Sequence, residues 1–111
     1  MLEVRIKELP IAAVAYLSGE ADARNCAELV RRLVAILETR PLRLVISLDG
    51  LQHIDSRGLG GLVGVYRRAQ EQKCAFFLVT SDPQLRRVIE VSGLSNLFQV
   101  RATEAEALSS E

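Results

Sequence analysis

The sequence predicts an α/β domain built on a mixed, mostly parallel β-sheet with an N-terminal hairpin and helices packed on it, in the order ββαβαβαβα. Three observations support this fold class. The chain opens with two segments of strand periodicity separated by Pro10. Apolar segments then alternate with segments of helical periodicity, which predicts parallel strands joined by helices. The 111 residues, 49% apolar and 25% charged, have the size and composition of one globular domain.

The first three elements follow from local patterns. Residues 2–9 alternate apolar with charged side chains, which is typical of a half-buried strand. Residues 11–19, "IAAVAYLSG", form the second strand of the predicted hairpin. Asn25 and Glu28 have the spacing of a capping box, and apolar positions recur at helical spacing from there to about Glu38. We therefore expect a hairpin followed by an amphipathic helix.

The later elements alternate regularly. They are a buried central strand over residues 42–48, a helix over 56–72, a buried strand over 74–80, a helix over 83–92, a short strand over 97–100 and a final helix. Pro83 is suited to the first helical position and Gly93 to a helix terminus. Thr103 and Glu106 have capping-box spacing, which predicts the start of the last helix.

Charge and cysteine content argue against several classes of protein. The 14 basic and 14 acidic residues give a formal net charge of +0, which argues against direct binding of nucleic acid. Cys26 and Cys74 lack metal-ligand spacing, and a reduced intracellular chain is the simplest account, with one disulfide as the alternative. The charged, alternating N-terminus resembles neither a signal peptide nor a membrane span. We expect a cytoplasmic protein with no membrane insertion, metal or cofactor.

A glycine-rich segment begins the second helix. Gly58, Gly60, Gly61 and Gly64 occupy helical positions, where glycine is unfavourable by roughly 0.5–1 kcal/mol relative to alanine. The apolar stripe expected to face the sheet comprises Leu59, Leu62, Val63, Tyr66 and Ala69. On a helical wheel Gly60, Gly61 and Gly64 lie opposite this stripe, with Arg57 at the edge. This arrangement predicts a bare surface on which another protein docks; the alternative is that some of these glycines pack beneath a neighbouring element.

Ser56 precedes these glycines at the predicted junction of strand and helix. Serine is a favourable N-cap, so Ser56 is expected to cap the helix. A hydroxyl at a helix N-terminus beside a bare surface is also suited to phosphorylation, because the first-turn N–H groups can accommodate about −1.5 to −2 units of charge. Asp55 would repel that phosphate, so the charge would act on the contact surface rather than within the fold. The pattern predicts a phosphorylation switch, with simple capping as the alternative.

Three motifs carry a resemblance to a known family. "IDSRGLGGL", residues 54–62, closely resembles the signature of STAS domains, specifically the bacterial anti-sigma factor antagonists. "LSGEADARNCAEL", residues 17–29, is similar to their second motif, and "VIEVSGLSNLFQV", residues 88–100, to their usual C-terminal segment. The resemblance covers nearly the whole chain with matching element order. It implies that residues 1–111 form a single STAS domain.

The resemblance implies a non-enzymatic regulator of sigma-factor-dependent transcription, with no catalytic residues. Its partners would be an anti-sigma factor that is also an ATP-dependent serine kinase, and a metal-dependent serine phosphatase. Carried over by position, Ser56 is the phospho-acceptor, and Asp22 is the acidic residue of an early loop that lies near it. With the bare helix surface, the predicted partner-binding set is Asp22, Asp55, Ser56, Arg57, Gly58, Leu59, Gly60, Gly61 and Gly64.

Three departures from the family pattern leave the partner's identity open. Residues 47–49 read Ser-Leu-Asp where the family often has Asp-Leu-Ser, and residues 23–25 read Ala-Arg-Asn where a Thr or Ser is usual after the acidic residue. Arg57 places a cation beside the proposed phosphate. Three alternatives therefore stay open. The chain could be a STAS accessory subunit of a lipid-transport ABC complex, part of a stress-sensing assembly, or a weak homodimer.

The sequence gives less support to two other classes of function, nucleotide binding and Ser-His-acid catalysis. Gly58-x-Gly60-x-x-x-Gly64, with Asp82 near the end of the next strand, loosely resembles a dinucleotide-binding fingerprint but is one residue too long. His53 lies three positions before Ser56, which suggests a Ser-His-acid triad. A ring at that spacing can rarely reach the hydroxyl, so we expect His53 to be a loop residue or part of the contact surface.

Overall fold

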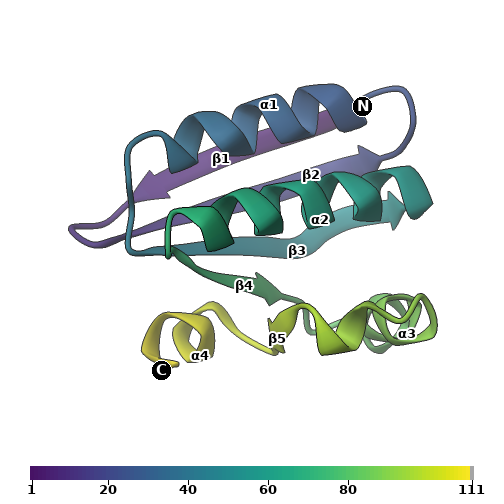
Figure 1. The fold of residues 1–111 in the computed structure, drawn as a ribbon. Helices are drawn as coiled ribbons and strands as arrows, with labels where there is room; N and C mark the ends of the chain where they lie inside the picture. The colour runs from purple at the N-terminus through teal and green to yellow at the C-terminus, as the bar shows by residue number, and fades with distance from the viewer. Residues whose placement is uncertain (111) are drawn as a thin grey trace.

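A five-stranded mixed sheet with strand order β1-β2-β3-β4-β5 organises the fold (Figure 1). Its strands are β1 (Leu2–Glu8), β2 (Ala12–Ala21), β3 (Arg43–Ile54), β4 (Ala75–Val79) and β5 (Gln99–Arg101). β1 pairs with β2 in antiparallel orientation, and the other neighbouring strands are parallel. This computed structural model describes residues 1–110, and Glu111, the last residue of the predicted domain, lies outside the described residues. The predicted order ββαβαβαβα is confirmed.

Helices cover both faces of the sheet. They are α1 (Cys26–Leu37), α2 (Ser56–Glu71), α3 (Pro83–Val91) and α4 (Glu104–Ser109), with a short 3-10 turn at Leu94–Asn96. α1 and α2 lie side by side (Figure 1). Leu33, Leu62 and Ile89 bring α1, α2 and α3 into one core with alternate residues of the strands. The intervening strand residues, such as Val45, face α4 in a second, smaller core. The side chains of β3 therefore enter both cores, as expected for a central strand.

Capping interactions set the ends of the last two helices as predicted. The Asp82 carboxylate accepts a hydrogen bond from the Gln84 N–H at 2.9 Å, with Pro83 at the first helical position. Gly93 follows α3 with φ of +81°, a left-handed conformation that favours glycine. Thr103 caps α4 by accepting from the Glu106 N–H at 3.1 Å.

β3 is longer than predicted, and this extension positions the candidate site. The sequence predicts a strand that ends near residue 48, yet pairing with β2 continues to Ile54 through two register shifts. Gly50 permits this pairing, because a Cβ at that position would lie 2.6 Å from the Leu17 carbonyl oxygen. The C-terminal residues of β2 and β3, Ala21 and Ile54, consequently lie opposite each other.

Asn25 does not cap α1, so the predicted capping box is wrong. Its side chain instead accepts from the Asp22 N–H at 3.0 Å and donates to the Glu20 carbonyl at 2.8 Å. Both contacts lie within the loop between β2 and α1. Asn25 therefore holds this loop in shape rather than closing the first turn of the helix.

Arg43 and Arg101 contact both the sheet and the C-terminal segment that includes α4. The guanidinium groups of Arg43 and Arg101 lie 4.8 Å and 5.1 Å from the centre of the Phe77 ring. Arg43 also donates to the Ala107 carbonyl at 2.8 Å and to the carbonyl of Ser110. These contacts hold the helix over the second core, at the opposite face from α1 and α2.

Candidate functional site

Ser56 is the exposed first residue of α2, but it is not the helix cap. Asp55 is the N-cap: one oxygen of its carboxylate accepts from the backbone N–H groups of Arg57 and Gly58, both at 3.0 Å. Its own N–H donates to the Ala21 carbonyl at 3.1 Å, which ties the helix start to the end of β2. The predicted capping role of Ser56 is therefore wrong. A Ser56 cap would make Arg57 the first helical residue, whereas α2 begins at Ser56 directly after the extended Asp55, one residue earlier.

Asp22 lies at the end of the strand paired with β3. It directly follows Ala21, which is opposite Ile54 and accepts the hydrogen bond from Asp55. The two acidic residues thus follow adjacent strand ends. A hydrogen bond from the Arg24 guanidinium, at 2.8 Å, holds the pKa of the Asp22 carboxyl below its usual value. Asp22 is engaged with this cation rather than with α2.

The four glycines of α2 divide into two pairs. A Cβ at Gly60 or Gly64 would meet nothing within 4 Å, so these two form an open glycine pair on the helix surface. A Cβ at Gly58 would lie 2.6 Å from the Ala21 carbonyl oxygen, and one at Gly61 would lie 3.1 Å from a methyl group of Val30 in α1. Gly58, which belongs to the predicted partner-binding set, packs against the end of β2, and the prediction of a bare surface is wrong for Gly61. A wheel drawn for α2 alone does not include α1, which packs along its side.

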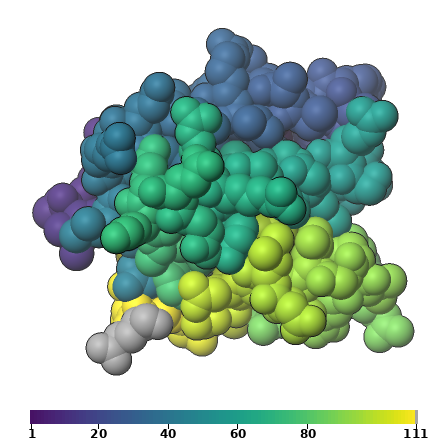
Figure 2. All heavy atoms as spheres, viewed as in Figure 1, coloured from purple at the N-terminus to yellow at the C-terminus, as the bar shows by residue number. Residues whose placement is uncertain are grey.

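The open glycine pair lies on α2, which packs beside α1. Figure 2, drawn from the same side as Figure 1, shows α1 and α2 packed into one continuous surface. Arg57 is exposed at the start of α2, as predicted. Leu59 is only 5% exposed and belongs to the core, so it contributes to the site as part of its floor.

An apolar groove lies between the start of α2 and α3. It has a volume of about 470 Å³, and we call it the α2–α3 groove. Its lining residues are Ile54, Asp55, Ser56, Leu59, Gln84, Arg87, Val88, Val91 and Ser92. Val91 is 75% exposed although it is apolar. The groove thus combines exposed apolar side chains with a rim of polar and charged ones.

Sequence reasoning missed the contribution of α3 to this groove. Gln84, Arg87, Val88 and Val91 recur at helical spacing and so share one face of α3. The signal in the sequence was weak, because the buried residues Leu85 and Ile89 account for the helical period of this segment on their own. Val88 and Val91 do not belong to this buried stripe of α3. Their position across from the start of α2 depends on the tertiary fold.

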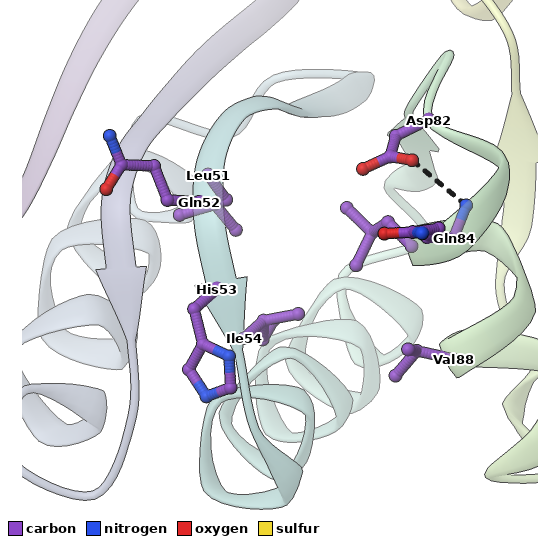
Figure 3. A pocket seen from close by; sticks show the side chains of 8 residues that line it. Leu51, Gln52, His53, Ile54, Asp82, Gln84 and Val88 are labelled. Atoms are coloured by element: carbon purple, nitrogen blue, oxygen red, sulfur yellow. Dashed lines mark hydrogen bonds between the residues drawn. The ribbon is translucent and has the colours of Figure 1, made fainter.

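His53 lies on β3, so the expectation of a loop residue is wrong. It lines an adjoining, smaller hollow of about 180 Å³, together with Asp82, the cap of α3, and Gln84 (Figure 3). Ser56 does not line this hollow, and His53 does not line the α2–α3 groove. The structure therefore does not bring the imidazole and the hydroxyl into one site. Asp82 is the acidic residue of the dinucleotide-binding pattern considered above. In the structure its carboxylate caps α3 (Figure 3).

No group of three or more His, Cys, Asp or Glu side chains within residues 1–110 could hold a metal ion. Cys26 and Cys74 are free thiols. Burial raises the pKa of the Cys74 thiol above its ordinary value. Of the helices described, none is both long and apolar enough to cross a bilayer.

Comparison with known proteins identifies consistent relatives. The family model of the STAS domain matches residues 3–107. The anti-sigma F factor antagonist of Paenibacillus polymyxa is 28% identical over 109 residues, covering 96% of this chain and 92% of the relative. The anti-sigma-B factor antagonist of Listeria monocytogenes is 26% identical over 91 residues, covering 82% and 80% respectively. The crystal structure of an anti-sigma factor antagonist from Mycobacterium paratuberculosis superposes with a TM-score of 0.90 at 27% identity, covering 98% of this chain and 92% of that one.

Proposed function

The chain belongs to the STAS domain family, and on this premise we propose that it is an anti-sigma factor antagonist whose partner docks at the start of α2. Phosphorylation of Ser56 releases the partner. The observation that carries the proposal is the exposed Ser56 hydroxyl, which is free of any capping role and lies at the edge of an apolar groove. The curated relatives above are named as anti-sigma factor antagonists, which supports this regulatory class over an enzyme.

The proposed docking surface combines the open glycine pair with the α2–α3 groove. Gly60 and Gly64 permit close approach of another backbone to α2. The valines of α3 supply apolar area, and burial of such area stabilises a complex by about 25 cal/mol per Å² before the losses of association. Arg57 and Arg87 add positive charge at the rim, which favours a partner with acidic residues facing them.

Phosphorylation would change this surface without changing the fold. The kinase partner positions ATP so that the Ser56 oxygen attacks the γ-phosphorus. The new oxygen–phosphorus bond forms as the bond to the β-phosphate oxygen breaks, ADP leaves, and the hydroxyl proton passes to a base on the kinase. The product carries about −1.5 to −2 charges beside the carboxylate of Asp55. Burial of that charge against an apolar partner surface is strongly unfavourable, so the complex dissociates.

A phosphatase reverses the switch by transferring the phosphoryl group to water. The bond between the Ser56 oxygen and phosphorus breaks, inorganic phosphate leaves, and the serine hydroxyl is restored. Because the capping bonds of Asp55 do not involve the Ser56 side chain, we expect the helix start to survive the cycle and the docking surface to be ready for the partner again. In the proposed cycle the chain therefore offers the partner the same docking surface with or without the charge of a phosphate on Ser56.

Intact-mass spectrometry tests the proposal. The chain is incubated with the anti-sigma factor kinase encoded in its own genome, ATP and Mg²⁺, and the gain of one phosphoryl group is measured. Ser56→Ala is expected to abolish that gain. Ser95→Ala is the matched control, because Ser95 is an exposed serine that does not line the groove, so its loss should leave the reaction unchanged. Phosphorylation of Ser56→Ala at the wild-type rate, or equal kinase affinity of the phosphorylated and free chains, would overturn the proposal.

A further inference from the structure

A phosphoryl group on Ser56 would find little stabilisation from the start of its own helix. Anions at helix N-termini are usually held by the free backbone N–H groups of the first turn. Here the Asp55 carboxylate already accepts from the N–H groups of Arg57 and Gly58. The N–H of Leu59 donates to the Asp55 carbonyl within the helix. The carboxylate also repels a second anion beside it, so an accommodating cation has to come from elsewhere.

Arg87 is placed to supply that cation. It lines the α2–α3 groove from the opposite wall, on the face of α3 that also presents Val88 and Val91. The ion pairs within residues 1–110 do not involve Arg87. Its guanidinium can bind a phosphate through two parallel hydrogen bonds. Arg57 is adjacent to Ser56 in sequence, yet it does not line the groove.

We propose that Arg87 binds the phosphoryl group of phosphorylated Ser56 across the α2–α3 groove and thereby covers the groove's apolar floor. This inference rests on the proposed function, in which Ser56 is the phospho-acceptor. The arginine stem and the phosphate would together span Leu59 and Val88. Phosphorylation would then exclude the partner in two ways, by adding charge and by closing the apolar surface into which the partner packs.

Phosphorus NMR on the chain with phosphoserine installed at position 56 during translation tests the pairing. The second ionisation of phosphoserine has a pKa of about 6, and a nearby guanidinium lowers it because it favours the dianion. We expect the phosphoserine pKa to lie about one unit lower in the otherwise unchanged chain than in the Arg87→Gln chain. Asp55 and Arg57 flank Ser56 in both chains, so this difference isolates Arg87, and Arg87→Lys should restore part of it.

Arg86→Gln is the matched control. Arg86 is the preceding residue of α3 and does not line the groove, so its loss removes the same charge from a different face. The Arg86→Gln chain should keep the lowered phosphoserine pKa. Equal phosphoserine pKa values in the Arg87→Gln chain and the otherwise unchanged chain would overturn the proposal, as would an equal shift from Arg86→Gln.

Methyl NMR with a neutral nitroxide in solution tests closure of the groove. Val88 and Val91 are 42% and 75% exposed, so the nitroxide should broaden their methyl signals in the unphosphorylated chain. Phosphorylation should protect the Val88 methyl groups, and this protection should be lost in Arg87→Gln. Equal broadening of the Val88 signals with and without phosphate would show that the groove stays open, which overturns the closure.

These measurements separate the inference from the proposed function. They use phosphoserine supplied by translation and require neither kinase nor anti-sigma factor. If Arg87 lowers the phosphoserine pKa but no kinase modifies Ser56, the proposed function fails while the pairing stands. If the kinase modifies Ser56 and releases the chain although Arg87 leaves the phosphoserine pKa unchanged, the proposed function stands and the pairing fails.

Discussion

The Asp55 carboxylate accepts the backbone hydrogen bond of Gly58 at 3.0 Å and closes the first turn of α2. The cap and the proposed phosphorylation site thus belong to adjacent residues. Asp55 stabilises the helix, while the neighbouring hydroxyl of Ser56 stays exposed and open to modification. A chain organised in this way can gain charge at the proposed docking surface without losing the cap of α2.

Because Asp55 caps α2 and Ser56 does not, alanine substitutions at the two positions should have different effects on the free energy of unfolding. Asp55→Ala should lower the free energy of unfolding by about 1 kcal/mol, because two first-turn N–H groups lose their acceptor. Ser56→Ala should change it by less than about 0.5 kcal/mol, because Ser56 is exposed and does not cap. Urea denaturation measures both values. Asp55→Asn, which keeps an acceptor oxygen, is the control, and equal losses from the two alanine variants would contradict the assignment.

The glycines of α2 should respond to alanine in opposite directions. Gly60→Ala and Gly64→Ala should each raise the free energy of unfolding by roughly 0.5–1 kcal/mol, because the added Cβ meets open space within a helix. Gly58→Ala should lower it by about 1–3 kcal/mol, because the Cβ would collide with the Ala21 carbonyl oxygen. Thermal or urea unfolding distinguishes these cases.

The open glycine pair also predicts a loss of docking without a loss of stability. Gly60→Gln places a long neutral side chain where the partner is proposed to approach α2. We expect weaker binding of the anti-sigma factor by isothermal titration calorimetry, with unfolding free energy unchanged or higher. Unchanged affinity in a folded Gly60→Gln chain would remove this helix face from the docking surface.

The α2–α3 groove predicts that Val91 contributes to partner affinity. Val91→Ser should weaken binding by roughly tenfold, since a buried apolar side chain contributes about 1.5 kcal/mol or more, while stability stays within about 0.5 kcal/mol. Leu42→Ser is the control, because Leu42 is 64% exposed and does not line the groove. A larger loss of affinity from Leu42→Ser than from Val91→Ser would place the docking surface elsewhere.

Arg43 should be required to hold α4 on the sheet. Arg43→Ala removes hydrogen bonds to two carbonyl groups of the C-terminal segment and the contact with Phe77, and should lower the free energy of unfolding by about 1–3 kcal/mol. Amide hydrogen exchange should increase most in α4. Arg68→Ala removes an exposed arginine of α2 and is the control. Uniform exchange changes across the whole chain would argue against local release of α4.

The ion pair between β1 and α4 predicts a pH-dependent contribution to stability. The pKa of the Glu104 carboxyl is held below its usual value by hydrogen bonds from the Lys7 ammonium and the Tyr16 hydroxyl, both at 2.6 Å. A lowered folded-state pKa stabilises the fold above the unfolded value of about 4.3, and this stabilisation is lost as pH falls through the folded value. The advantage of wild type over Glu104→Gln should therefore be full near neutral pH and vanish in acid.

Urea denaturation across that pH range measures the difference. Glu3→Gln removes a charge from the same strand as Lys7 without touching the pair, and its difference from wild type should not follow the same acid transition. A constant difference between wild type and Glu104→Gln down to strong acid would contradict the lowered Glu104 pKa.

Much of the fold could be read from local spacing. The order of strands and helices, the Pro83 start and Gly93 end of α3, and the Thr103 cap of α4 all depend on residues within a few positions of one another. Interactions of this kind are set by backbone geometry and by side chains that reach their own neighbours. These helix starts and ends could be predicted from the sequence because no distant segment competes for the backbone groups that the caps bind.

The details of the candidate site depended on distant segments. β3 extends to Ile54 because the end of β2, more than thirty residues earlier, offers it a pairing edge, and Asp55, which directly follows, is the cap of α2. Gly61 is covered because α1 packs beside α2.

The α2–α3 groove exists because α3 places Val88 and Val91 across from the start of α2. The sequence by itself determined which residue carries the hydroxyl and where its helix lies. The tertiary structure decided which side chains surround that hydroxyl, because packing between elements depends on their relative placement in space and not on the period within any one of them.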